Sequence, residues 1–309
     1  MKTIRKPICL LLTAASLCAC SKSESGEQLS GGDAIRLSAG LPSASVQSKA
    51  PIESGNKFIP AVAGWESTAA ASYTAAPTWN TTTSEITAST TAQEVELTAP
   101  QVYNANGAVK TYMKAWYPQG TLSSGTVTFT TNDSYKGDGT DDVLLAGEVS
   151  GSKSDRDNKV LAFEHLTTQL KFVVKAGTGL AEGTKLTKIE LKNVDVPNGI
   201  NLATNALLTS SKNALSVPDI DGNLVIGTTE TGDAAGSPLM IVPPTGKTVT
   251  LKVTTSAAEF DNIVATIDND DNFQAGKAYT ITLTFDQKNI ELSATLAEWS
   301  AGTGTGLVE

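Results

Sequence analysis

Residues 160–175 read VLAFEHLTTQLKFVVK and lie near the middle of the 309-residue chain. From Leu166 onward apolar and polar residues alternate, which is the period of a half-buried strand. Upstream, Leu161 and Phe163 follow the opposite parity, so the pattern shifts by one residue at Glu164-His165. A strand that changes face in this way either bulges or crosses from one sheet or domain to another. We interpret the shift as a crossing between two domains.

The rest of the chain is rich in short alternating segments separated by Gly-, Asn- or Pro-bearing turns. Residues 279–285 and 290–296 alternate strictly and predict a closing hairpin, and residues 109–117, apolar on both faces, predict a central strand. Many short strands with regular turns predict an all-β protein built of β-sandwiches, and the length favours two. The expected division is 33–158 for the N-terminal sandwich and 159–309 for the C-terminal sandwich.

The chain is acidic, with a formal net charge of -9. Removing residues 1–19 would take away three cations, Lys2, Arg5 and Lys6, and leave about -12. Such a charge gives no electrostatic basis for binding nucleic acid. It suits a self-repelling surface exposed outside the cell.

The first twenty residues have the form of an export signal. A basic start is followed by an apolar stretch, residues 8–17, that is too short to span a bilayer as a stop-transfer helix. The stretch ends in Leu17-Cys18-Ala19-Cys20, which resembles the bacterial lipobox. We therefore expect a signal peptide over 1–19, acylation of Cys20 and a flexible lipid-anchored tether over 20–32. The alternative is a simple secretory signal cleaved near Ala19.

Residue types that carry catalysis or bind metals are scarce. The three cysteines are Cys9, Cys18 and Cys20, so no disulfide, thiolate metal site or cysteine nucleophile is expected beyond the leader. His165 is the one histidine, and its sequence neighbours Glu164 and Leu166 supply no triad geometry. A structural role for His165 is favoured. We expect no enzyme, no catalytic residue, no metal and no cofactor.

Two acidic turns could be mistaken for calcium loops. One contains Asp138, Asp141 and Asp142, and the other spans residues 268–271. Neither has the twelve-residue loop that ends in Glu. Solvated turns are expected, and calcium binding stays open.

Three features together resemble the fimbrillin family, the pilins of type V fimbriae of Gram-negative anaerobes. They are the lipobox leader, the central Phe163-x-His165 pattern that continues to Leu170, and the closing strands over 276–299 that end with Trp299. The resemblance implies two transthyretin-like β-sandwich domains. It also implies transport to the outer membrane as a lipoprotein, removal of the first strand by a trypsin-like protease, and acceptance of a strand from another subunit.

The resemblance also assigns the strand that is removed and the site of the cut. The first strand carries its apolar residues at Ile35, Leu37, Ala39 and Leu41. The family is cut just after this strand, between a basic and a small residue, which here matches Lys49-Ala50. The alternative, Arg36, lies inside the strand. An ordinary exposed loop lysine is the other interpretation of Lys49.

The donor strand in this family is the C-terminal one. Here it would carry Ile290, Leu292, Ala294 and Leu296, which alternate as a groove-filling strand must. The alternative is that this strand only completes its own sandwich.

The leading hypothesis is a structural subunit of a cell-surface fimbria at the outer membrane, with other fimbrial subunits as partners. Stalk, tip and anchor positions stay open, as does a host or glycan ligand. The alternative function is a surface lipoprotein that binds glycan for nutrient capture. Exposed aromatic residues in a groove would favour the alternative, so Trp65, Trp79 and Trp116 are the residues to inspect.

Overall fold

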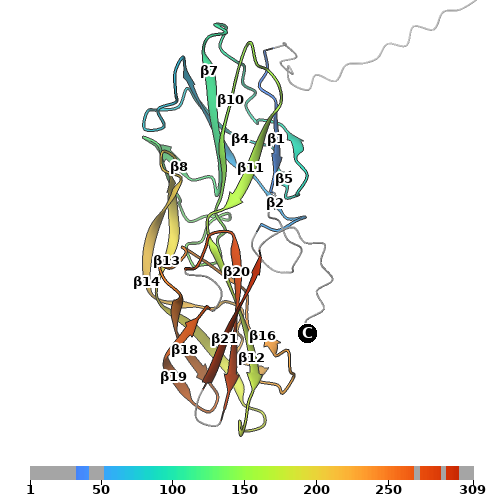
Figure 1. Cartoon of the computed structure of the whole chain (residues 1–309), viewed down its shortest axis with the longest axis vertical. Coiled ribbons are helices and arrows are strands. Elements are labelled where there is room, and N and C mark those ends of the chain that lie inside the picture. The colour runs from blue at the N-terminus through green and yellow to red at the C-terminus, as the bar shows by residue number, and fades with distance from the viewer. Residues whose placement is uncertain (1–32, 42–51, 268–271, 287–289, 299–309) are drawn as a thin grey trace, which may run out of the picture. The chain divides into compact units, whose positions relative to one another are not determined.

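Strands and turns make up the whole of the described chain. The computed structural model describes residues 33–41, 52–267, 272–286 and 290–298, and these contain no helix. The prediction of an all-β protein is confirmed (Figure 1). Within these ranges no helix is long and apolar enough to cross a membrane.

The first sheet has seven strands and contains most of the N-terminal half. Its spatial order is β4-β3-β7-β10-β11-β1-β6, so the first strand of the chain lies inside the sheet. A separate two-stranded ribbon pairs β2 (Lys57–Phe58) with β5 (Ile86–Thr87). The strands of the first sheet, in chain order, are β1 (Leu37–Gly40), β3 (Ala61–Ser67), β4 (Trp79–Thr82), β6 (Gln93–Val95), β7 (Lys110–Tyr117), β10 (Leu144–Ser152) and β11 (Lys159–His165).

Two further sheets contain most of the C-terminal half. One has the order β16-β12-β20-β21, with β17 also pairing with β12; the other has the order β19-β18-β13-β9-β8, with β14 and β15 also pairing with β13. The strands of the first of these are β12 (Thr168–Ala176), β16 (Asp233–Ala234), β17 (Leu239–Ile241), β20 (Lys277–Phe285) and β21 (Ile290–Glu298). Those of the second are β8 (Thr121–Ser123), β9 (Thr126–Thr128), β13 (Lys185–Asn201), β14 (Ala206–Ser216), β15 (Leu224–Val225), β18 (Thr248–Thr255) and β19 (Glu259–Thr266).

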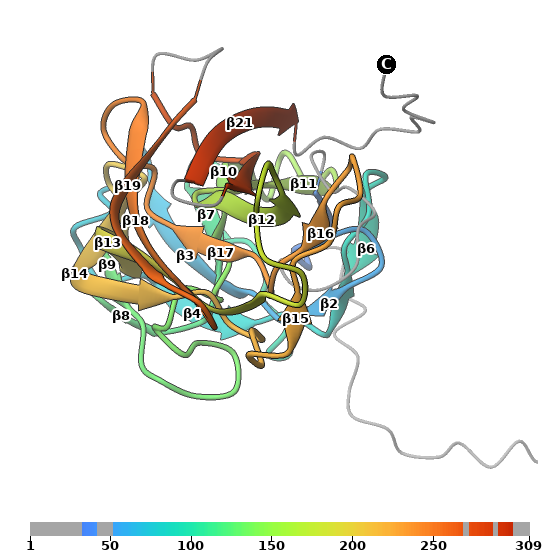
Figure 2. The same ribbon diagram turned by 90° about the horizontal axis from the view of Figure 1, so that it is seen from below.

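The C-terminal core lies between these two sheets. Leu170 and Phe172 of β12 and Tyr279 of β20 share one buried cluster with Ile189 of β13 and Leu251 of β18. Each of these strands alternates buried with less buried positions, as a sheet with one face on a core requires. Figure 2 shows β18 and β19 on one side of this region and β12 and β16 on the other.

The first sheet buries side chains on both of its faces. Met113 of β7 joins one apolar cluster with β1 and β11, whereas Trp116 of β7 joins another with Val127 of β9 and Ile200 of β13. The sequence prediction that residues 109–117 form a central strand is confirmed, because β7 lies between β3 and β10. The closing hairpin is confirmed as well, since β20 and β21 pair over nine residue pairs.

Two local expectations are wrong. Asn106-Gly107 suggests a two-residue hairpin turn, but the segment before it does not pair with β7. Val102 instead forms a bridge with Ala34, because its neighbour Tyr103 is buried in the core beside the first strand. The apolar pattern of residues 186–196 and 200–208 predicts two separate strands. In the structure β13 runs unbroken from Lys185 to Asn201, with a bulge near Pro197 in its pairing with β14, and residues 206–208 begin β14 after a turn.

The central stretch changes sheets at the point where its pattern shifts. β11 ends at His165 in the first sheet, and β12 begins at Thr168 in the next. The strand pairings cross the expected division in both directions, since β11 pairs with β1 and β10 while β8 and β9 join β13. Residues 33–158 and 159–309 therefore do not form separate sets of sheets, and a two-domain organisation stays a prediction.

A buried carboxylate braces the crossing. Asp142 Oδ2 lies 2.8 Å from His165 Nδ1, and Asp142 Oδ1 accepts a 2.9 Å hydrogen bond from the Thr167 hydroxyl. The backbone N–H of Ile52 also donates to Asp142 Oδ2, at 3.1 Å. The side chains of His165 and Asp142 are 0% and 2% exposed, so His165 has the structural role that the sequence favours.

We expect Asp142→Ala to destabilise the protein by about 3 kcal/mol, because it leaves the side chains of His165 and Thr167 buried without their acceptor. Urea denaturation followed by tryptophan fluorescence measures the change. Asp133→Ala is the matched control, since Asp133 is exposed on the neighbouring loop, and it should change stability by less than about 0.5 kcal/mol. Equal effects of the two substitutions would contradict a bracing role for Asp142.

Candidate strand-exchange groove

β1 is an interior strand with a neighbour on each side. It runs parallel to β11, where Leu37 is opposite Lys159 and Gly40 is opposite Ala162, and antiparallel to β6, where Leu37 is opposite Val95. The backbone bonds continue beyond the strand, from the N–H of Ile35 and that of Leu41 to loop carbonyls, at 2.9 and 2.8 Å. Figure 1 shows β1 in blue alongside β11.

The inward row of β1 is almost completely buried. Ile35, Leu37, Ala39 and Leu41 are 8%, 1%, 2% and 1% exposed. They belong to the same apolar cluster as Leu161 and Phe163 of β11, Val95 of β6 and Tyr103. At about 25 cal/mol for each Å² of apolar surface buried, this row stabilises the first sheet substantially.

The outward row of β1 differs from residue to residue. Arg36 is exposed, whereas Ser38 is 7% exposed and its hydroxyl accepts a 2.6 Å hydrogen bond from Asn158 Nδ2. Gly40 lies close to a neighbouring segment, since a Cβ placed on it would be 3.2 Å from the Cα of Ala92. Only the position of Arg36 therefore has room for a large side chain.

Two ion pairs hold Asp33, which lies four residues before the start of β1. Asp33 forms ion pairs with Lys153 at 3.0 Å and with Arg156 at 3.1 Å, all three side chains being partly exposed. Such exposed pairs contribute at most about 1 kcal/mol each. The Asp33 carbonyl also accepts the N–H of Tyr103, and burial, with a smaller effect of the Asp155 charge, raises the pKa of Tyr103 to about 12. The apolar row, rather than these ion pairs, holds β1 in place.

β21 lies at the edge of its sheet. Its one strand partner among the described residues is β20, with which it pairs from Lys277–Glu298 to Phe285–Ile290. Ile290, Leu292 and Leu296 are only partly buried against the C-terminal core, and Ala294 is 6% exposed. An edge strand of this kind can separate from its sheet by breaking one ladder of hydrogen bonds.

The model of the fimbrillin-like family matches residues 48–299, which is more than half of the chain. The chain belongs to the fimbrillin-like family. A comparison with curated proteins finds no match.

Solved structures support the fold of this fimbrillin-like chain. A putative cell adhesion protein from Bacteroides uniformis is 19% identical, with a TM-score of 0.52, over 87% of this chain and 100% of that one. A putative cell adhesion protein from Bacteroides ovatus is 12% identical, with a TM-score of 0.55, over 87% and 98% of the two chains. At these identities the likeness concerns the fold alone.

The predicted site residues of the fimbrillin-like chain divide into three groups. Ile35, Leu37, Ala39 and Leu41 form the buried inward row of the first strand, and Ile290, Leu292, Ala294 and Leu296 form the inner face of β21. Arg36 has an exposed side chain, but its carbonyl accepts the N–H of Lys159 at 3.1 Å. Cys20, Lys49 and Ala50 lie outside the described residues.

The first acidic turn differs from the expectation. Asp141 and Asp142 are 8% and 5% exposed, so the prediction of a solvated turn is wrong for both. Asp141 accepts the backbone N–H groups of Lys136 and Gly137, and burial nevertheless raises its pKa. The second acidic turn, residues 268–271, lies outside the described residues. Within the described ranges no group of three or more His, Cys, Asp or Glu side chains is placed to hold a metal ion.

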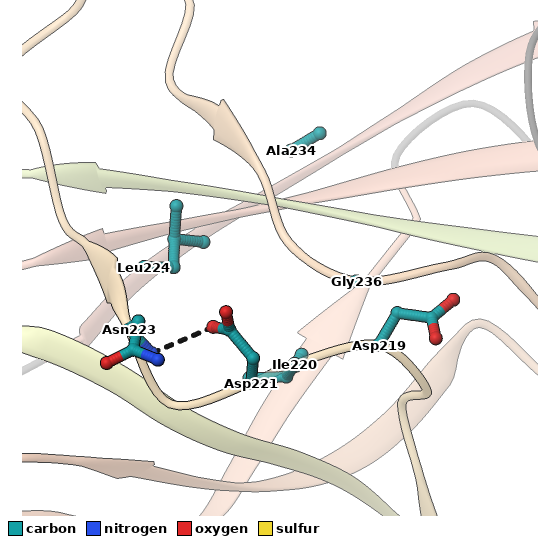
Figure 3. A pocket seen from close by; sticks show the side chains of 7 residues that line it. All are labelled: Asp219, Ile220, Asp221, Asn223, Leu224, Ala234 and Gly236. Atoms are coloured by element: carbon teal, nitrogen blue, oxygen red, sulfur yellow. Dashed lines mark hydrogen bonds between the residues drawn. The ribbon is translucent and has the colours of Figure 1, made fainter.

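A pocket near β15 and β16 also lacks the features of a reactive centre. Asp219 and Asp221 line it together with Leu224 (Figure 3). Asp221 accepts the N–H of Asn223 at 2.8 Å, and Asp219 accepts the Ser237 hydroxyl. Both carboxylates are thus engaged by their own loops, and the pocket offers no nucleophile–base pair.

The inspected tryptophans form no exposed platform for a glycan. Trp65 and Trp116 are 3% and 0% exposed, and their indole N–H groups donate to the carbonyls of Ala75 and Gln119. Trp79 is half-buried and covers Gly64, where a Cβ would lie 2.3 Å from the indole ring. All three side chains serve the packing of the first sheet.

We expect Leu37→Ala to lower the free energy of unfolding by about 2–5 kcal/mol, because it removes a buried methine and two buried methyl groups and leaves a cavity. Arg36→Ala, one residue away on the exposed face, should change it by less than about 0.5 kcal/mol. Chemical denaturation of the two variants beside the parent measures both. If the two variants are equally stable, the inward row of β1 does not hold the first sheet together.

Proposed function

We propose that this chain is a non-enzymatic structural subunit of a cell-surface fimbria, exported as a lipoprotein through Cys20 and assembled by strand exchange after its first strand is removed. Membership of the fimbrillin-like family supports the fimbrial role. The observation that carries the strand exchange is the interior position of β1 between β11 and β6. The lipobox leader supports the export route, and the sandwich packing of the C-terminal sheets is compatible with two transthyretin-like domains.

The energetics of a missing interior strand support the assembly step. Without β1, the facing edges of β11 and β6 would each lose a ladder of hydrogen bonds, and β6 would lose its one strand partner in the described structure. Apolar side chains of the core, Phe163 and Leu161 among them, would line an open groove. A strand from another subunit restores both the ladders and the burial, which is the basis of strand addition.

The structure around β1 favours Lys49 over Arg36 as the processing site. A protease binds its substrate in an extended form with free backbone groups, and the carbonyl of Arg36 is engaged by Lys159 within the sheet. A cut after Lys49 would release Ile35 to Leu41 as one segment. A cut at Arg36 would leave most of the strand in the groove.

Low-dose trypsin on the chain that starts at Ser21 should cut before Ala50, release a fragment that contains β1, and produce an SDS-resistant ladder. Mass spectrometry identifies the fragment and gel electrophoresis without heating detects the ladder. Lys49→Gln should abolish both, whereas Arg36→Gln should leave both unchanged. A ladder formed by the Lys49→Gln variant would exclude Lys49 as the processing site.

A disulfide that fixes β1 to β11 should block assembly. Ser38 is paired with Val160 in the parallel register, and both lie on the outward face of the sheet. Adjacent strands are about 4.8 Å apart, within the Cα separation that a disulfide spans. Trypsin should still cut the oxidised Ser38→Cys/Val160→Cys variant, but the ladder should appear only after reduction.

The control for this variant is Arg36→Cys/Val160→Cys. Residue 36 lies two positions before residue 38, the partner of residue 160. Its cysteine should therefore form no disulfide with residue 160, and assembly should be insensitive to oxidation. Normal assembly of the locked, oxidised chain would contradict removal of β1 as the step that opens the groove.

A further inference from the structure

A buried lysine of β7 contacts an asparagine side chain in the turn between β13 and β14. Lys114 is 4% exposed, and its Nζ lies 2.6 Å from Oδ1 of Asn205 and 2.5 Å from the carbonyl oxygen of Leu202. Both of these acceptors are neutral, although lysines buried this deeply are usually paired with a charge. The contact therefore brings an amine and a carboxamide together at the border of the core.

We propose that Lys114 and Asn205 become joined by an intramolecular isopeptide bond. Nζ of the lysine forms a bond to Cγ of the asparagine, the bond between Cγ and Nδ2 breaks, and Nδ2 leaves as ammonia. One amine and one carboxamide give one secondary amide and one ammonia, so the atoms and electrons balance without an oxidant or a reductant. The site goes beyond the proposed function and does not depend on strand exchange.

The two atoms that would bond are already close to each other. Because a C=O bond is about 1.2 Å long, Cγ of Asn205 lies within about 3.8 Å of Nζ of Lys114. Reacting atoms in a productive arrangement are about 3–3.5 Å apart. A neutral amine has two hydrogens and one lone pair. The carbonyl of Leu202 can therefore hold one hydrogen while the lone pair turns toward Cγ.

The apolar surroundings favour the neutral amine that this attack requires. Trp116, which lies on the same face of β7, and Leu202 belong to one buried cluster, and Tyr73 packs against it. The centroid of the Tyr73 ring is 4.3 Å from Nζ of Lys114. Burial, the largest effect, lowers the pKa of Lys114 against the opposing charge of Glu148. A lysine whose pKa is lowered by burial is a better nucleophile at neutral pH.

A β-bulge places a carboxylate beside the lysine. The pairing of β10 with β7 shifts at residues 147–148, so that both of them stand opposite Lys114. The second of these is Glu148, which accepts a hydrogen bond from the hydroxyl of Tyr73. Bulges re-aim side chains and are frequent next to reactive sites. Glu148 is thus positioned to take the proton that Nζ loses and to return it to the departing Nδ2.

The turn that carries the asparagine is fixed by its own hydrogen bonds. Asn205 has a φ of 59°, in the left-handed region that asparagine adopts more readily than most residues. Oδ1 of Asn201 accepts the N–H groups of Ala203 and Thr204, at 2.9 and 3.1 Å. Asn205 is itself exposed, so the released ammonia has a direct path to solvent.

The bond would tie the first sheet to the sheet that contains β13. Lys114 and Asn205 are 91 residues apart in the sequence, and the loop closed between them contains the crossing at His165. Closing a long loop removes conformations from the unfolded chain and stabilises the folded one. Hydrogen-bonded strands can be pulled apart by force, whereas an amide bond holds. Such a bond would suit a subunit that carries tension along a fibre.

Intact mass spectrometry of the denatured chain tests the proposal. The chain that starts at Ser21 should be lighter than its sequence requires by the mass of one ammonia molecule. After proteolytic digestion, tandem mass spectrometry should identify a branched peptide that contains both Lys114 and Asn205. A chain of full mass would overturn the proposal. The branched peptide is sought in the parent chain, so the test holds even if a variant fails to fold.

Two substitutions should each restore the full mass. Lys114→Met keeps a long apolar side chain, and Asn205→Gly keeps a residue that accepts the left-handed turn. The matched controls are Lys110→Met, at an exposed position of the same strand, and Asn193→Gly, at an exposed position with a φ of 52°. Both controls should remain lighter by one ammonia. Full mass in either control would contradict the assignment of the two bonded residues.

A second source of ammonia loss must be separated from the cross-link. Asn106 and Asn198 each precede a glycine, and an asparagine in this setting can cyclise onto the next backbone nitrogen with release of ammonia. Such a loss would persist in the Lys114→Met variant and would give no branched peptide. Persistence of the loss in that variant would therefore overturn the proposal.

Glu148→Gln tests the proton transfer. Glu148 is exposed, so the variant should fold with an unchanged thermal midpoint, but the cross-link should form about a hundredfold more slowly, as expected when a general acid–base group is lost. Cell-free synthesis followed by mass spectrometry at timed intervals measures the rate. Glu164→Gln, exposed on β11, is the control and should match the parent. A parental rate in Glu148→Gln would overturn the role given to Glu148.

Discussion

The backbone hydrogen bonding of β1 is the constraint on which the rest of the first sheet depends. The strand is only Leu37–Gly40, yet it supplies the facing ladder for both β11 and β6 and fills the core beneath them. Buried backbone groups without partners are costly, so the sheet needs a strand at this position. The sheet does not need that strand to belong to the same chain. A strand of another chain could therefore fill the position of β1, provided that its apolar residues follow the same pattern.

The contacts at the crossing between β11 and β12 hold β11, the strand that forms one side of the groove. Asp142, whose side chain is 2% exposed, is held from three separate points, His165, Thr167 and the backbone of Ile52. A buried carboxylate with satisfied partners resists displacement, because moving any partner exposes a charge to an apolar interior. β11 is therefore held at its C-terminal end independently of β1. In the proposed assembly, loss of the first strand would open an edge without freeing β11, which would receive the replacement.

The alternation of apolar and polar residues was enough to predict several strands. It was not enough to predict contacts between residues far apart in the sequence. The strands over 279–285 and 290–296, and the sheet change near His165, follow from period and phase alone. The roles of Asn158 beside Ser38, and of Lys153 beside Asp33, are invisible in the sequence, since each pair is separated by about 120 residues. Burial of Asp141 and Asp142 was missed for the same reason. Turn-like composition indicates solvent, but here Asp141 accepts backbone N–H groups of its own loop and Asp142 contacts His165 and Thr167 at the crossing.

The burial of its apolar row would keep β1 in place after the cut that we propose. Four buried apolar side chains contribute roughly 1.5–3 kcal/mol for each of the larger ones, and these contributions do not depend on a covalent link to the rest of the chain. In the proposed assembly, a severed β1 would therefore stay bound until a competitor displaced it. Displacement one residue pair at a time keeps most of the groove covered, whereas complete release first would expose the whole apolar surface at once. In the proposed assembly, the competitor that advances most easily would be one whose apolar residues match those leaving.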